Sequence, residues 1–167
     1  EYEDGRHPKE VVFTAELRED LRRRDFTINA MAYSHETGIV DIFGGAEDLA
    51  ARRIRCVGDA GERFTEDALR ILRAVRFSAQ LGFSIEKKTW QALCELAPSL
   101  VHVSKERVQV ELTKTLLSDR PEFIWKTEAA GLAPYISKTF PEVFAAWKKQ
   151  KSCAKQSLEE KVCSKDV

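Results

Sequence analysis

Three consecutive arginines stand directly before an aspartate in the segment Arg22–Thr27, which reads Arg-Arg-Arg-Asp-Phe-Thr. Guanidinium groups match phosphate oxygens in geometry and charge, and a helix N-terminus also favours anions. Arg24 is therefore a candidate for binding a triphosphate, and the carboxylate of Asp25 is a candidate acceptor for a ribose hydroxyl. The same residues also fit a solvated arginine cluster in which Asp25 caps a helix, and this segment alone leaves both interpretations open.

A second set of charged residues lies on one face of a helix that the apolar spacing predicts over Thr65–Gln80. At about 100° per residue, the apolar positions fall on one arc and most charged positions on the opposite arc. The charged positions are Glu66, Asp67, Arg70 and Arg73. Asp67 lies one turn from Arg70, so the simplest interpretation is a surface ion pair with i,i+3 spacing.

A sharper interpretation makes Asp67 and Arg70 a reader of nucleotide bases. Cytosine and adenine each present an exocyclic amine beside a ring acceptor nitrogen. Asp67 would accept from the amine and Arg70 would donate to the ring nitrogen. Uracil and guanine present a carbonyl beside an N–H, so they would leave polar groups mismatched. Such a pair would select C and A without a nucleic-acid template.

The helix predicted over Ser104–Leu117 carries several more charges, including Arg107 and Glu111. We interpret them as partners in salt bridges within and between helices, and expect them to support the helix that carries the acid–base pair. In the helix predicted over Thr65–Gln80, Arg76 falls among the apolar positions and Phe77 among the polar ones.

Composition excludes several classes of protein. Lys+Arg and Asp+Glu both number 27, so net charge is zero and any RNA contact must come from local clustering. The four cysteines form no CxxC pair, which argues against a zinc site and favours free thiols in a reducing cytoplasm. No apolar run approaches the length that spans a membrane. The sequence contains no P-loop and no GxGxxG motif.

The predicted elements change in character near residue 58, from mixed strands and helices to helices alone. We predict N-caps at Thr27, Thr65 and Ser104 and C-caps at Gly82 and Gly131. The predicted strands are Val11–Thr14, Gly38–Phe43 and Arg53–Val57, and the predicted helices are Thr27–Tyr33, Ala46–Ala51, Thr65–Gln80, Ser84–Leu96, Ser104–Leu117 and Pro121–Ala130.

Four segments resemble, in order, the motifs of class II CCA-adding tRNA nucleotidyltransferases and bacterial poly(A) polymerases. Arg23–Ala32 resembles the RRDFTINAMA motif, and Asp41–Asp59 resembles the connector from head to neck. Arg63–Phe77 resembles the nucleotide-recognition helix with its EDxxR motif, and Ser104–Leu117 resembles the neck motif that starts with Glu-Arg. The resemblance runs from Asp4 to Ile136.

The resemblance implies an α+β fold. Residues 1–58 would be the C-terminal part of a polymerase-beta-like nucleotidyltransferase head, and 59–118 an all-helical neck for nucleotide recognition and RNA binding. Residues 119–167 would be the start of a helical body with a Lys-rich tail. The implied nucleotide-binding residues are Arg24, Asp25, Asn29, Asp67, Arg70 and Arg73, and the implied supporting residues are Glu66, Arg107 and Glu111.

In that family, the 3′ end of tRNA attacks CTP or ATP with the help of Mg²⁺ held by an Asp-x-Asp pair. We expect this pair upstream of the present residues, so we assign no catalytic residue and no metal ligand here, and expect no activity from the chain alone. The Asp-Gly-Arg-His-Pro loop favours CCA addition, and poly(A) synthesis or addition of only A or only CC remain alternatives. A non-catalytic RNA- or nucleotide-binding module is the alternative of another class.

Overall fold

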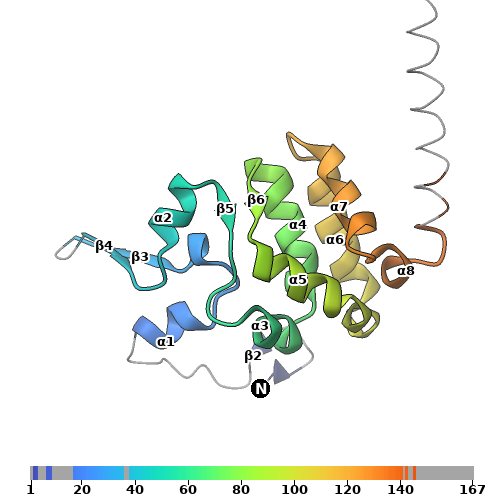
Figure 1. Ribbon diagram of the computed structural model, residues 1–167. Helices are drawn as coiled ribbons and strands as arrows, with labels where there is room; N and C mark the ends of the chain where they lie inside the picture. Colours follow the sequence, from blue (N-terminus) through green and yellow to red (C-terminus); the bar gives the residue numbers. More distant parts are fainter. Residues whose placement is uncertain are drawn as a thin grey trace, which may run out of the picture.

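The computed structural model describes residues 2–3, 7–8, 17–35, 38–140, 142 and 145. Figure 1 shows a small mixed region of short strands and helices beside a helical bundle, in agreement with the predicted α+β class. The mixed region contains β1 (Tyr2–Glu3), β2 (His7–Pro8), α1 (Leu17–Arg22), the 3₁₀ helix η1 (Thr27–Asn29), β3 (Met31–Ser34), β4 (Gly38–Asp41), α2 (Gly45–Ala50) and β5 (Arg53–Ile54).

The helical region follows β5 along the chain. It contains α3 (Ala60–Glu66), α4 (Leu69–Leu81), β6 (Ser84–Ile85), α5 (Lys87–Glu95), η2 (Ala97–His102), α6 (Lys105–Leu116), η3 (Pro121–Ile124), α7 (Trp125–Ala129) and α8 (Ala133–Ile136). None of the described helices is long and apolar enough to cross a membrane.

An antiparallel hairpin and a short helix form most of the mixed region. Strands β3 and β4 pair from Met31 opposite Asp41 to Ser34 opposite Gly38. Asp41 then starts α2, because its two carboxylate oxygens accept from the backbone N–H groups of Gly45 and Ala46, each at 2.8 Å. Burial opposes ionisation of Asp41, but these N–H donors hold its pKa below the ordinary value.

Gly45 lets α2 pack directly against η1. A Cβ atom at this position would lie 2.3 Å from the carbonyl oxygen of Thr27 and 3.0 Å from the side chain of Met31. Any larger residue would therefore push α2 away from η1.

The strand predicted over Gly38–Phe43 is confirmed as β4, which ends two residues earlier, and the helix predicted over Ala46–Ala51 is confirmed as α2, shifted by one residue. The strand predicted over Arg53–Val57 is shorter, since β5 ends at Ile54. The helix predicted over Thr27–Tyr33 is wrong: a single 3₁₀ turn is followed by β3, because the chain there pairs with β4. The strand predicted over Val11–Thr14 lies outside the described residues, as does the tail.

The helix predicted over Thr65–Gln80 is in fact two helices with a break at Asp67 and Ala68. Asp67 has an extended backbone, with φ −150° and ψ 101°. Its Oδ1 accepts from the N–H of Leu69 at 3.1 Å, a local bond by which Asp competes with a continuing helix. Thr65 is therefore not an N-cap but lies inside α3, where its hydroxyl donates to the carbonyl of Gly61.

The helix predicted from Ser84 begins later, because Ser84 and Ile85 form β6. This strand pairs in parallel with β5 and so joins the helical region to the mixed region. Glu86 then caps α5 by accepting from the N–H of Thr89 at 2.8 Å. Ser104 is confirmed as the N-cap of α6, and Gly82 as the left-handed C-cap of α4.

The helix predicted over Pro121–Ala130 consists of two helices of different type. A 3₁₀ turn over η3 leads directly into α7. Gly131 has a positive φ of 69° and lies one residue beyond the C-cap Ala130.

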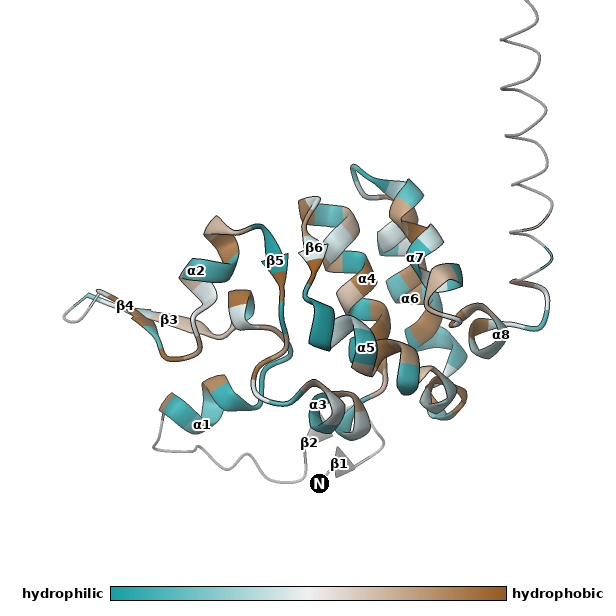
Figure 2. Cartoon of the chain, in the orientation of Figure 1, coloured by the Kyte–Doolittle hydropathy of each residue, from teal (hydrophilic) through white to brown (hydrophobic). Residues whose placement is uncertain are grey.

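One hydrophobic core crosses the boundary predicted at residue 58. Phe26 and Ile54, from the mixed region, pack in the same cluster as Phe64, Leu72 and Leu93. Figure 2 shows hydrophobic and hydrophilic residues mixed along α4 and α6, as expected of helices that bury one face. The division at residue 58 remains a prediction, and the packing makes the two regions interdependent.

Arg76, which broke the apolar pattern, forms a buried ion pair between α4 and α6. Its Nε lies 2.6 Å from Oε2 of Glu111, and the two residues are 8% and 4% exposed. No third group among the described residues forms a hydrogen bond with either atom, so each has only the other as its partner. The Arg76 guanidinium also lies over the ring of Phe77, 4.0 Å from its centroid. Glu111 thus supports α4, as expected for a residue on α6.

We predict that Arg76→Ala lowers the free energy of unfolding by about 3–5 kcal/mol, because it leaves the Glu111 charge buried without a partner. Replacing both residues by methionine should recover most of the loss, since it removes both charges. Urea unfolding followed by circular dichroism measures both effects. A loss below about 1 kcal/mol for Arg76→Ala, typical of an exposed pair, would contradict the burial described here.

Candidate functional site

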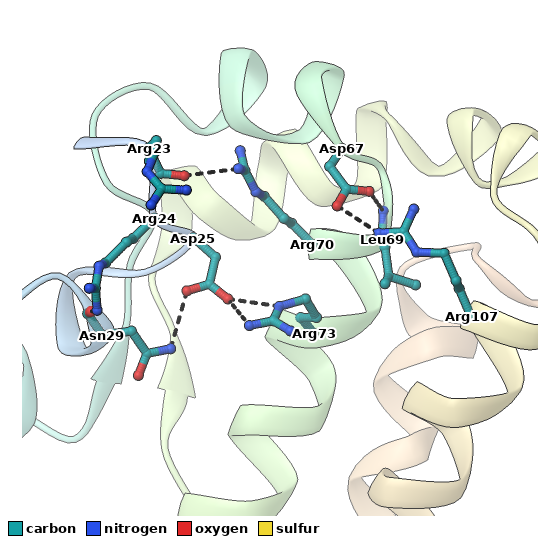
Figure 3. A pocket seen from close by; sticks show the side chains of 9 residues that line it. All are labelled: Arg23, Arg24, Asp25, Asn29, Asp67, Leu69, Arg70, Arg73 and Arg107. Carbon is teal, nitrogen blue, oxygen red and sulfur yellow. Dashed lines mark hydrogen bonds and ion pairs between the residues drawn. The ribbon is translucent and has the colours of Figure 1, made fainter. Parts of the chain in front are cut away.

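A polar cavity of about 600 Å³ lies between the mixed region and the helices. Three parts of the chain line it: the segment before and within η1, the break between α3 and α4, and the start of α6 (Figure 3). The lining residues are Arg23, Arg24, Asp25, Asn29, Asp67, Leu69, Arg70, Arg73 and Arg107. Five arginines against two aspartates give the cavity an excess of positive charge, which suits an anionic ligand.

The arginines of the first segment are held by their neighbours. Arg24 donates to the backbone carbonyl of Asn29 at 2.9 Å and to Asp20 at 3.1 Å. Arg23 also donates to Asp20, and hydrogen bonds from both arginines lower the pKa of that carboxyl. Both guanidinium groups keep further N–H donors, because each has five.

Asp25 is buried and accepts four hydrogen bonds. Its Oδ1 accepts from the N–H of Phe26 at 2.8 Å and from Nδ2 of Asn29 at 3.1 Å. Its Oδ2 accepts from Nε and Nη2 of Arg73 at 2.8 and 2.5 Å. A carboxylate has about four lone-pair sites, so the protein itself occupies all of them.

Asp67 faces the cavity from the break between α3 and α4. Its Oδ2 accepts from Nη2 of Arg107, on α6, at 2.9 Å. The predicted ion pair between Asp67 and Arg70 is wrong, because Arg70 instead pairs with Glu66 at 2.8 Å. The break explains the difference, since Asp67 leaves the helical path and no longer lies one turn below Arg70.

Arg63 and Arg70 tie the helices to the chain between α1 and η1. Arg63 donates to the carbonyl of Arg22 at 3.2 Å, and Arg70 donates to the carbonyl of Arg23 at 3.0 Å. Glu66 accepts from both arginines, one on each carboxylate oxygen. Together with the bond from Arg73 to Asp25, these contacts hold the segment before η1 against helices α3 and α4.

Asp48 holds the same segment from the other side. This side chain is fully buried, and it accepts from the hydroxyl of Thr27 at 2.6 Å. Arg53 and Arg55 donate to it at 2.6 and 2.7 Å. Burial opposes its ionisation, but the three donors hold its pKa below the ordinary 3.8. Sequence reasoning missed Asp48, because a single aspartate on a short polar helix gives no signal.

The cavity brings together seven of the residues that the sequence singled out. Glu66 and Glu111 do not line it and act on other side chains. Arg23 and Leu69 line the cavity but were not predicted as site residues. Their position in the sequence beside predicted site residues was the only feature that could have indicated them. The seven residues are Arg24, Asp25, Asn29, Asp67, Arg70, Arg73 and Arg107.

The described residues offer no metal site. No group of three or more His, Cys, Asp or Glu side chains in this part of the chain is placed to hold an ion. Cys56 and Cys94 are free, and burial raises the pKa of the Cys56 thiol to about 12. Cys153 and Cys163 lie outside the described residues.

Two family profiles match this chain. The poly A polymerase head domain matches residues 1–55, and the probable RNA- and SrmB-binding site of polymerase A matches residues 82–145. The chain is 56% identical over 119 residues to the CCA-adding enzyme of Leuconostoc mesenteroides, and 53% identical over 133 residues to that of Bacillus licheniformis. These alignments cover 71% and 80% of the chain but only 30% and 31% of the relatives.

Solved structures agree with the sequence comparison. The CCA-adding enzyme of Bacillus stearothermophilus in complex with CTP matches with a TM-score of 0.72 at 45% identity, over 74% of this chain and 32% of that one. The Thermotoga maritima enzyme complexed with tRNA matches with a TM-score of 0.66 at 33% identity, over 71% and 30%. The chain thus spans about a third of the length of these proteins.

The mixed region, the helical region and the cavity between them define part of a nucleotidyltransferase head with its neck. The chain belongs to the family of CCA-adding enzymes and bacterial poly(A) polymerases.

We predict that Asp48→Asn lowers the free energy of unfolding near neutral pH by about 2 kcal/mol, because two arginines lose a charged acceptor. Since the folded pKa of Asp48 is depressed, its contribution is present above the unfolded value of 3.8 and is lost as pH falls through the lower folded pKa. Thermal melts of both proteins from about pH 7 to about pH 2 measure the difference. A gap that stayed constant over this range would contradict the role of the ionised carboxylate.

Proposed function

We propose that the chain is the nucleotide-selecting part of an enzyme that adds CCA to the 3′ end of tRNA from CTP and ATP. The single observation that supports this best is the cavity, in which Asp67 and Arg70 share one space with Arg24. A nucleoside triphosphate site needs polar groups that recognise the base and cationic groups that bind the phosphates. The longer protein would act in the cytoplasm, where its tRNA and nucleotide substrates are found.

Base selection would come from Asp67 and Arg70. The carboxylate of Asp67 is held by Leu69 and Arg107, and keeps acceptor positions for the exocyclic amine of cytosine or adenine. Arg70 is 16% exposed in its side chain and uses part of its donors on Glu66, Arg63 and Arg23, so an N–H remains for the ring nitrogen. Uracil and guanine would set carbonyl against carboxylate and N–H against guanidinium.

Triphosphate binding would fall to Arg24, with Arg23 beside it. Their guanidinium groups line the same cavity, and phosphate contacts carry no information about the base. Mg²⁺ enters the proposal only for the longer protein. The described residues provide no set of ligands for it, so we assign no step of the reaction to a metal here.

Our first test replaces Asp67 or Arg70 by alanine and measures binding of CTP, ATP, UTP and GTP to the chain by calorimetry. Each variant should bind CTP and ATP about 5- to 150-fold more weakly, because a contact worth about 1–3 kcal/mol is lost. The preference over UTP and GTP should shrink by a similar factor.

Glu47→Ala serves as the control, because this exposed acid lies outside the cavity. It should leave all four affinities unchanged. Thermal melts establish that the variants remain folded. Folded Asp67 and Arg70 variants with an unaltered nucleotide preference would refute base reading by these residues. Binding of ATP without CTP in the wild type would favour a poly(A) polymerase.

A separate prediction concerns Arg24→Ala. Loss of one charge-assisted phosphate contact should weaken CTP and ATP by the same factor, about 10-fold or more. Titrations of CTP, ATP and the corresponding nucleosides test this, because the nucleosides carry no phosphate and should be unaffected. If Arg24→Ala changed the ratio of CTP to ATP affinity, the assignment to the triphosphate would fail.

A further inference from the structure

The arginines that line the cavity do not all have a carboxylate of their own. Three of the five, on α4 and α6, each pair with an acid that no other cavity arginine shares. Arg23 and Arg24 instead share one acid, Asp20 on α1. Among the described residues, the five guanidinium groups are therefore bonded to four carboxylates. The one positive charge in excess lies at Arg23 and Arg24, the end of the cavity that we assign to the triphosphate.

Asp20 bridges these two guanidinium groups with both of its carboxylate oxygens. Its Oδ1 accepts from Nε and Nη2 of Arg23 at 3.0 and 2.5 Å, and its Oδ2 accepts from Nη2 of Arg24 at 3.1 Å. The hydrogen bonds from both arginines hold the pKa of Asp20 below the ordinary 3.8, so the carboxylate is charged near neutral pH. Asp20 thus offsets charge and occupies N–H donors that a phosphate would otherwise use.

The two arginines have other anchors besides Asp20. Arg24 also donates to the carbonyl of Asn29 at 2.9 Å, and the carbonyl of Arg23 accepts from Arg70 at 3.0 Å. The Arg24 side chain and the backbone of Arg23 therefore stay held when Asp20 is replaced. Among the described residues, the contribution that Asp20 alone makes to this pair is a negative charge.

We propose that Asp20 is a counter-charge that lowers the affinity of the cavity for phosphate groups. It leaves Arg23 and Arg24 with a single net positive charge, so phosphates bind less tightly than two free guanidinium groups would allow. Transfer of a nucleotide from CTP or ATP leaves pyrophosphate, which has no base to hold it, and the counter-charge favours its release. This inference rests on the proposed nucleotide site and adds a residue that sets the strength of phosphate binding there.

Asp20→Asn tests the proposal, because it removes the charge and keeps an oxygen that can accept hydrogen bonds. The net charge at Arg23 and Arg24 rises from one to two. The affinity for inorganic tripolyphosphate and for CTP should therefore each increase about 5- to 20-fold at low salt. Cytidine carries no phosphate and should bind as it does to the wild type. Calorimetric titration measures all three affinities, and tripolyphosphate binding that is unchanged or weaker in Asp20→Asn would overturn the proposal.

Glu19→Gln is the matched control. Glu19 lies on the same helix and loses the same charge, but it pairs with Arg22 at 4.0 Å, and neither residue lines the cavity. This substitution should change the affinity for tripolyphosphate by no more than about twofold. Asp20→Glu keeps the charge and should also stay within about twofold of the wild type. Equal gains from Glu19→Gln and Asp20→Asn would reveal an effect of overall charge and would overturn the proposal. Thermal melts establish that the variants remain folded.

Ionic strength gives a second measurement on the same proteins. The side chains of Arg23 and Arg24 are 77% and 45% exposed, so salt screens the charges around them. The advantage of Asp20→Asn over the wild type should fall to about twofold or less as salt is raised from about 0.05 M to about 0.5 M. An advantage that did not change with salt would contradict a counter-charge. A wild type that binds no CTP would overturn the proposed function as well, whereas CTP binding without a gain in Asp20→Asn would overturn this inference alone.

Discussion

The candidate site exists because arginines of the helical region bind the chain between α1 and η1. Arg63 and Arg70 donate to two successive backbone carbonyls, and Arg73 donates to the buried carboxylate of Asp25. Glu66 accepts hydrogen bonds from both of the first two arginines and so links them. These bonds hold the segment Arg22–Asn29 opposite the break at Asp67, while Asp48 and the buried Phe26 hold it from the other side. The boundary between head and neck is thus the place where the cavity is assembled.

This arrangement places cationic groups around the cavity without leaving them unpartnered. Each arginine uses some N–H donors on carbonyls or carboxylates and keeps others for a ligand, which the five donors of a guanidinium permit. Preorganised donors cost little further ordering when an anion arrives. The break between α3 and α4 also preorganises the cavity, because it turns Asp67 toward Arg107 and the cavity. The buried pair of Arg76 and Glu111 fixes α4 against α6, which sets the distance between these groups.

The sequence was most informative where chemistry is local. The Ser104 cap and the Gly82 C-cap follow from residue type and spacing, and most cavity residues were indicated by the charged motifs together with the family resemblance. It was least informative where distant segments decide the outcome: β3 replaced a predicted helix because it pairs with β4, and β6 formed because β5 lies beside it. The break at Asp67 lacks glycine or proline, so nothing in the helical period indicated it. The saturation of Asp25 depends on Arg73, which lies on another element, and no reading of one segment can reveal that.

Asp25, Asn29 and Arg73 form one hydrogen-bonded network beside Asp67 and Arg70, and Arg24 is bonded to Asn29. The groups proposed to bind the phosphates and the base therefore have positions that depend on one another. A crystal structure of the chain with CTP tests this most directly. We expect the cytosine amine at Asp67, its ring nitrogen at Arg70 and the triphosphate beside Arg24, with the four bonds of Asp25 intact. CTP bound outside the cavity, or with its base turned away from Asp67 and Arg70, would contradict it.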